Sequence, residues 1–104
     1  MNTQDQSIAQ AVKAVARTFD PTAKVVFFGS RARGTHHTDS DYDFLILFHI
    51  PVGFQLKTQV LDKLYDVELQ QGCVLGVLVE NAETWKMHVH TPIFSAIQGE
   101  GIAV

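Results

Sequence analysis

The sequence predicts a small α/β or α+β fold, in which a β-sheet is layered with helices. Two observations predict it. Short runs of β-branched and aromatic residues alternate with segments whose apolar residues recur every three to four positions. Apolar residues make up 46% of the 104 residues and charged residues 18%, a balance typical of globular chains. A chain of this length supports one hydrophobic core, so we expect a single domain over residues 1–104.

The first half of the chain predicts one helix, two strands and a helical turn. Residues 7–19 carry apolar side chains at helical spacing, and the Asp-Pro pair that follows should end the helix. Residues 24–28 are mostly β-branched and aromatic, which predicts a buried strand, and residues 31–34 could form one helical turn. Residues 43–50 contain a continuous apolar run without a polar face, which predicts a second buried strand.

The second half predicts a long helix followed by shorter elements. Residues 55–71 have an apolar stripe at helical spacing, and Gly72 is a suitable residue to end that helix. We expect a third strand, two short helices and a terminal strand at residues 74–79, 82–89, 92–98 and 101–103. The side chains expected to face the core from these helices are Leu56, Val60, Leu61, Leu64, Val67, Leu69, Trp85, Ile93, Phe94 and Ile97.

Composition excludes several classes of protein. The formal charge of −3 and the pI near 5.9 argue against a generic nucleic-acid binder, because affinity for phosphate backbones needs a net basic face. The single Cys73 cannot form an internal disulfide or a cysteine-based zinc site alone, which favours a reducing compartment. The N-terminus has no signal-peptide pattern and no apolar run is long enough to span a membrane. We therefore expect a cytoplasmic protein without membrane contact.

Carboxylates gather at the start of the second strand. Residues two apart in an extended chain project from the same face, so Asp41 and Asp43 should lie side by side, and Asp39 shares their parity. Two adjacent carboxylates repel each other unless a cation neutralises them. Mg²⁺ takes one or two protein carboxylates and completes its shell with water and substrate phosphates, so it suits this pair better than Ca²⁺ does. Asp39 is more typical of a turn or cap.

A phosphate-binding turn is expected after the first strand. Gly29 would let the backbone approach a ligand, and Ser30 offers a hydroxyl and an N–H at the start of a helical turn. Arg31 and Arg33 add cationic donors that match phosphate oxygens. Two adjacent strands would thus hold a metal-bound polyphosphate between them.

This combination resembles the signature of the DNA polymerase β-like nucleotidyltransferase superfamily: a Gly-Ser turn, ten residues, and then Asp-x-Asp at the opening of an apolar strand. In particular, the chain is similar to the minimal nucleotidyltransferase (MNT) proteins, small single domains with a G-S-x-A-R-G…S-D-x-D core. The matching residues are Gly29, Ser30, Ala32, Arg33, Gly34, Ser40, Asp41 and Asp43.

The resemblance implies a fold, a reaction and a partner. The fold is a mixed sheet flanked by helices, the polymerase β-like nucleotidyltransferase fold. Gly29 and Ser30 would cradle a nucleoside triphosphate, and Asp41 and Asp43 would hold Mg²⁺ while a nucleoside monophosphate, AMP from ATP, passes to an acceptor with loss of pyrophosphate. MNT proteins are often paired with helical HEPN proteins in toxin–antitoxin modules, so a HEPN-type partner is the acceptor that the resemblance implies.

One departure from the family leaves an alternative open. Family members commonly carry a third acid on a following strand, where this chain offers Gly76 and no acid. Either Asp39, Glu80 or a partner chain supplies the missing carboxylate, or the domain is a catalytically degenerate module that binds a nucleotide or a protein. The sequence leaves the oligomeric state open, a homo-oligomer included.

Overall fold

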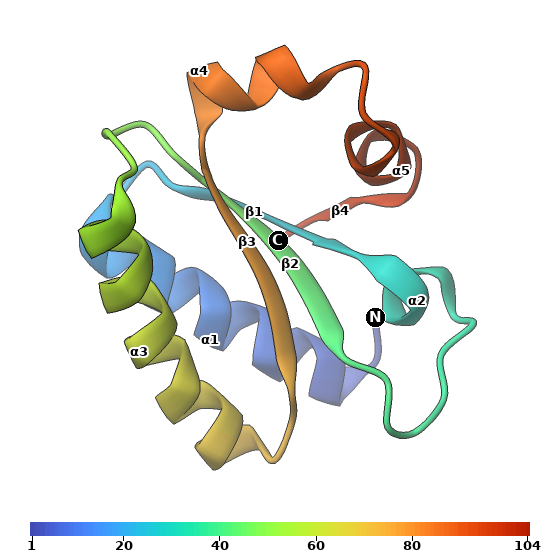
Figure 1. Ribbon diagram of the computed structural model, residues 1–104. Coiled ribbons are helices and arrows are strands. Elements are labelled where there is room, and N and C mark those ends of the chain that lie inside the picture. Colours follow the sequence, from blue (N-terminus) through green and yellow to red (C-terminus); the bar gives the residue numbers. More distant parts are fainter.

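The sheet has four strands in the order β3-β2-β1-β4 in the computed structural model, which describes residues 1–104 (Figure 1). The strands are β1 (Lys24–Phe28), β2 (Tyr42–Phe48), β3 (Leu75–Asn81) and β4 (Ile102–Ala103). Strand β1 pairs antiparallel with β2 and β4, whereas β2 and β3 run parallel. The mixed sheet implied by the resemblance is therefore confirmed, with β3 and β4 as its two edges.

Helices cover both faces of this sheet. They are α1 (Thr3–Phe19), α2 (Gly29–Arg33), α3 (Phe54–Gln71), α4 (Ala82–Trp85), the 3-10 helix η1 (Lys86–His88) and α5 (Pro92–Glu100). Helices α1 and α3 lie together on one face, α4 and α5 lie on the other, and α2 lies at the end of β1 (Figure 1). None of the helices is both long and apolar enough to cross a membrane.

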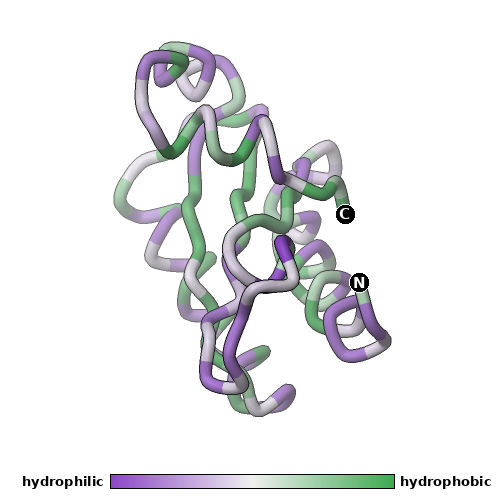
Figure 2. Tube along the Cα trace, turned by 90° about the vertical axis from the view of Figure 1, so that its right-hand side faces the viewer, coloured by the Kyte–Doolittle hydropathy of each residue, from purple (hydrophilic) through white to green (hydrophobic).

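Two hydrophobic clusters, one on each face, form the core. Side chains alternate along a strand, so β2 contributes to both clusters. The larger cluster, against α1 and α3, receives Tyr42, Phe44, Ile46 and Phe48 from this strand. The smaller cluster consists of Phe28, Leu45, Trp85 and Ile97. Figure 2 shows the apolar strands as mainly green segments, between loops and helices in which purple residues are more frequent. This alternation places Asp43 on the face of the smaller cluster.

Most expected elements are present with shifted ends. Helix α1 begins at Thr3 instead of residue 7, because Asn2 and Asp5 form a capping box in which Asn2 Oδ1 accepts the Asp5 N–H at 2.8 Å. The strand expected over 43–50 runs from Tyr42 to Phe48. The helix expected over 82–89 is divided into α4 and η1.

Three side chains expected in the core are exposed, so those expectations were wrong. Leu61 is 48% exposed, Leu69 66% and Ile93 41%. The buried face of α3 consists of Val60, Leu64 and Val67. Because β3 beneath α3 is an edge strand, no neighbouring element covers the outer side of this helix.

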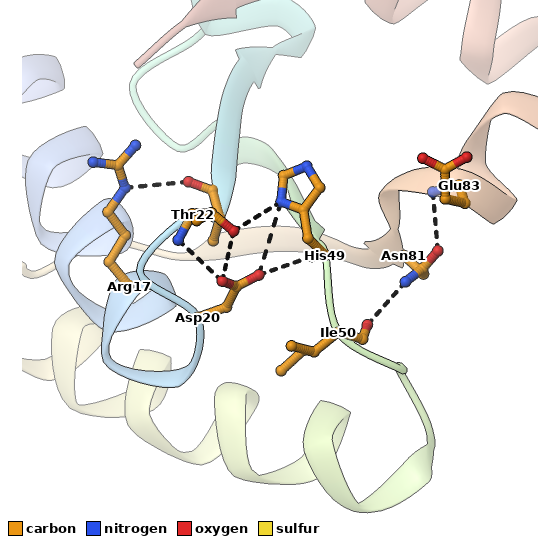
Figure 3. A network of polar contacts seen from close by, with 8 residues as sticks. Arg17, Asp20, Thr22, His49, Ile50, Asn81 and Glu83 are labelled. Atoms are coloured by element: carbon orange, nitrogen blue, oxygen red, sulfur yellow. Dashed lines mark hydrogen bonds and ion pairs between the residues drawn. The ribbon is translucent and has the colours of Figure 1, made fainter.

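A polar network joins the elements at the end of the sheet opposite the Gly-Ser turn (Figure 3). Asp20 follows α1 and is only 5% exposed. Its carboxylate accepts hydrogen bonds from the backbone N–H of His49 at 2.8 Å and from the N–H and hydroxyl of Thr22 at 3.0 and 2.7 Å. The His49 N–H is the main cause that lowers the pKa of Asp20. One carboxylate thus links the end of α1 with the start of β1 and the end of β2.

Candidate active site

Asp43 lies between two glycines at the start of β2. Its neighbours in the sheet are Phe28, the last residue of β1, and Gly76 on β3. Gly29 has a φ of +82° and lies so close that a Cβ there would collide with Asp43 Oδ2. A Cβ at Gly76 would lie 2.6 Å from Oδ1. The Gly-Ser turn and Asp43, the second carboxylate of the Asp-x-Asp pair, therefore meet.

The carboxylate of Asp43 is in an environment that disfavours negative charge. Burial raises its pKa, and the charges of Asp41 and Glu100 raise it further, whereas Arg33 lowers it. Asp41 itself is exposed. Neither carboxylate accepts a hydrogen bond within the chain, so their oxygen atoms are free to bind a cation or water. An Asp41–Asp43 pair of this kind fits Mg²⁺, which needs only one or two protein carboxylates.

Helix α2 brings Ser30 and Arg33 to the same side as Asp43. The Ser30 hydroxyl makes no hydrogen bond within the chain, while its carbonyl accepts the N–H of Thr35 at 3.0 Å and closes the turn. Arg33 Nη1 lies 2.7 Å from Glu100 Oε2 at the end of α5, and the Arg33 side chain is 49% exposed. Arg33 is thus a cationic donor beside the carboxylates, held by an ion pair that water can reach.

Arg31, the other arginine expected to bind phosphate, packs against Tyr42 and the loop before β2. Its guanidinium carbon is 4.1 Å from the centre of the Tyr42 ring, and Tyr42 belongs to the cluster on the α1 and α3 side. Arg31 Nε donates to the Ser40 carbonyl at 2.8 Å and Nη2 to the Thr38 carbonyl at 3.0 Å. These bonds fold the loop between α2 and β2, so Arg31 organises the loop that presents Asp41.

The candidates for a third carboxylate are not brought to Asp43 within one chain. Asp39 is exposed and lines a cavity of about 860 Å³ that also contains Arg31 and Tyr42. Glu80 lies four residues along β3 from Gly76, about 13 Å at the rise of a strand. No three His, Cys, Asp or Glu side chains gather closely enough to hold a metal ion.

Glu100 is a site residue that sequence reasoning missed. Its charge raises the pKa of Asp43. It also pairs with Arg33, which lies 67 residues away in the chain. No local pattern marks it, because its position depends on how α5 returns to the sheet. The next residue, Gly101, packs so tightly against Ile97 and Val26 that a Cβ there would lie 2.5 Å from the Ile97 carbonyl oxygen. This tight packing holds Glu100 beside α2.

Comparisons with known proteins agree with this geometry. A curated relative from Methanocaldococcus jannaschii, named a putative protein adenylyltransferase, is 25% identical over 99 residues, which cover 94% of each chain. A solved structure of a toxin–antitoxin with AMP-PNP matches with a TM-score of 0.66 and 17% identity, over 91% of this chain and 70% of that chain, which supports the polymerase β-like fold. A family model described as a nucleotidyltransferase domain matches residues 8–97. The chain therefore belongs to the nucleotidyltransferase domain family.

Proposed function

We propose that this protein is a Mg²⁺-dependent nucleotidyltransferase that transfers AMP from ATP to a protein acceptor. The observation that carries this proposal is the contact of the Asp43 carboxylate with Gly29, with Asp41 near enough to raise its pKa. A triphosphate at the Gly29-Ser30 turn would lie next to this carboxylate pair. The two parts that nucleotidyl transfer needs, a phosphate-binding turn and a pair of metal ligands, would therefore lie in one place.

Each residue has a chemical task in this reaction. Asp41 and Asp43 would hold Mg²⁺, which when bound offsets the charge that builds on the α-phosphate. The Ser30 hydroxyl is free to donate to a phosphate oxygen, and Arg33 can exchange its Glu100 partner for the triphosphate. An acceptor hydroxyl then forms a bond to the α-phosphorus as the bond to pyrophosphate breaks, and its proton passes to water. The protein contributes mainly position and charge.

The acceptor that we propose is a helical partner protein of the HEPN type. In such a toxin–antitoxin pair the partner would be the toxin, and this protein would neutralise it by adding AMP. Two comparisons support a protein acceptor: the relative is named a protein adenylyltransferase, and the structural neighbour comes from a toxin–antitoxin with AMP-PNP.

The experiment is label transfer. The protein is incubated with Mg²⁺, ATP labelled on the α-phosphate and the product of its neighbouring gene, beside an Asp41→Ala, Asp43→Ala double variant. We expect label on the partner protein, lost in the double variant and retained in the control Asp62→Ala, which removes an exposed carboxylate from α3. Nucleotide binding without transfer, across a range of acceptors, would contradict the enzyme and favour the alternative below.

The alternative is a catalytically degenerate module that binds a nucleotide or a protein. The observation that favours it is Gly76, which stands where the family commonly has its third acid, while no three acids of the chain gather closely enough to hold a metal ion. Such a module would transfer no label in this assay, although calorimetry would detect its binding of ATP. Protection of the partner's target without any label on the partner would also support it.

A further inference from the structure

The outer edge of β3 is open. It is the last strand on its side of the sheet, and in Figure 1 it passes in front of β2 and β1 with no other element drawn across it. The Val74 carbonyl accepts the N–H of Tyr42 on β2. Because the backbone groups of successive residues point to opposite sides of a strand, those of Val77 and Val79 point away from the sheet, where they have no hydrogen-bond partner.

Strand β3 also lacks the features that usually protect an edge. Edge strands of monomeric proteins commonly carry Lys, Pro or a bulge. This strand reads Leu-Gly-Val-Leu-Val-Glu-Asn, so it has no Lys or Pro, and Glu80 is its single charge. Its pairing with β2 is regular throughout, so it has no bulge. One outward group is occupied, since the Leu75 N–H donates to Glu68 Oε2 at 2.8 Å. The remainder of the edge is suited to pairing with another strand.

An exposed apolar stripe of α3 runs beside this edge. It consists of Leu61, Tyr65 and Leu69, which are 48%, 58% and 66% exposed and lie four residues apart on one helix face. The side of α3 that faces α1 is different, because there Phe19 of α1 meets the polar residues Gln59, Asp62, Lys63 and Asp66. Leu61 and Tyr65 therefore lie on the side of α3 turned away from α1. Leu69 continues the row toward the end of the helix, where it also lines a cavity with Asn2 and Gln4.

We propose that a second copy of this chain pairs with β3 in antiparallel orientation, about a twofold axis at Leu78. This register gives all seven residues of β3 a counterpart. It places Val77 opposite the partner's Val79 and Gly76 opposite the partner's Glu80, so no like charges meet across the strands. A long acidic side chain then faces a residue that has no side chain.

The helix stripe is complementary about the same axis, which favours a second copy over an unrelated protein. Going from Gly72 back to Tyr65 along α3 covers about 10 Å, as does going from Leu75 forward to Leu78 along β3. Tyr65 therefore lies beside the axis. Because residues equidistant from a twofold axis meet their counterparts, Leu61 faces the partner's Leu69, and two exposed apolar stripes cover each other.

The pairing completes the site proposed above, so this step rests on the proposed function. Gly76 and Glu80 have the same parity and project to the face of Asp43. Gly76 would form a non-hydrogen-bonded pair with the partner's Glu80, with Cα atoms about 4.5 Å apart. Glu80 has no hydrogen bond or ion pair within its own chain, and no side chain at position 76 blocks its path to Asp43. The partner's Glu80 thus supplies the carboxylate that is missing at Gly76.

The dimer is tested by cross-linking and by a charge in the stripe. In a Cys73→Ser background, Leu78→Cys should form an intermolecular disulfide on mild oxidation, while Val89→Cys, at an exposed position outside β3 and away from the proposed axis, should not. Tyr65→Glu should convert the dimer to a folded monomer in light scattering, whereas Gln70→Glu, the same charge on an exposed position of that helix, should not. A wild-type monomer together with unlinked Leu78→Cys would overturn the pairing.

Transfer between subunits is tested by mixing two variants. Glu80→Gln and Asp43→Asn should each transfer little label alone, and each should bind Mn²⁺ more weakly by paramagnetic resonance without nucleotide. Mixed in equal amounts, they should recover about one quarter of wild-type transfer, because half of the random dimers keep one complete site. Full transfer by Glu80→Gln alone would overturn the role of Glu80 and leave the proposed function intact. If the wild-type protein transfers no label but Leu78→Cys still cross-links, the proposed function is refuted and the strand pairing stands.

Discussion

At the scale of single residues, the site depends on the space that two glycines leave for Asp43. A Cβ on Gly29 would collide with its carboxylate, and one on Gly76 would approach within 2.6 Å. A third acid at position 76 would have to displace Asp43 from its present position. The carboxylate of Asp43 itself fills the room where the resemblance places that acid, which explains why Gly76 and Asp43 are compatible in this chain.

The first prediction concerns the cost of this arrangement. Burial and the neighbouring Asp41 and Glu100 raise the pKa of Asp43, so its ionised form is disfavoured in the folded protein. Asp43→Asn should therefore raise the free energy of unfolding in metal-free buffer at pH 7, while it abolishes transfer. Urea unfolding checks this, with the exposed Asp41→Asn as the control that changes stability less. A destabilised Asp43→Asn protein would show that the fold needs this charge.

A second prediction concerns the ion pair of Arg33. Its Nη1 lies 2.7 Å from Glu100 Oε2, and both charges act on Asp43. Glu100→Gln should release the guanidinium and remove a negative charge near the triphosphate, so ATP should bind about two- to fivefold more tightly, the scale of an exposed ion pair. Calorimetry measures this against Glu83→Gln, which removes the exposed partner of Lys86. Weaker binding by Glu100→Gln would instead make Glu100 a positioning residue for Arg33.

At the scale of elements, hydrophobic periodicity located the helices and strands but not what covers them. The stripe over 55–71 correctly predicted α3, yet Leu61 and Leu69 are exposed because β3 below them is an edge strand. Strand order depends on long-range pairing, which no local spacing reveals. The Gly29 to Asp43 contact was predictable because both residues lie in one motif, whereas Glu100 reaches the site from the other end of the chain.

The start of α1 shows a local signal that periodicity overlooked. Asn2 and Asp5 form a reciprocal capping box, and this extends the helix to Thr3, ahead of its first apolar residue. Asn2→Ala should destabilise the protein by about 1 kcal/mol, because the N–H of Asp5 loses its acceptor. Thermal unfolding measures the loss, and Gln4→Ala, an exposed change in the same turn, should have little effect. Equal stability of both variants would show that α1 does not depend on this cap.

At the scale of the whole molecule, the two ends of the sheet have different tasks. The end with Gly29 and Asp43 holds carboxylates without hydrogen bonds, ready for a ligand. The other end is closed by Asp20, whose carboxylate accepts three hydrogen bonds from Thr22 and His49 and is nearly inaccessible (Figure 3). The ionised carboxylate of Asp43 therefore disfavours the folded state, whereas that of Asp20 favours it.

The pH dependence of stability should separate these two carboxylates. Hydrogen bonds from His49 and Thr22 lower the pKa of Asp20 below its ordinary value of 3.8, so its ionised form stabilises the fold. That contribution is complete above the ordinary value and disappears as the pH falls through the lowered one. Asp20→Asn should therefore be less stable than wild type at pH 7, and the difference should shrink at acid pH. Urea unfolding across this range provides the test, with the exposed Asp62→Asn as control. A difference that stays constant down to the lowest pH would mean that shape and not charge makes Asp20 important, because only the charge is lost on protonation.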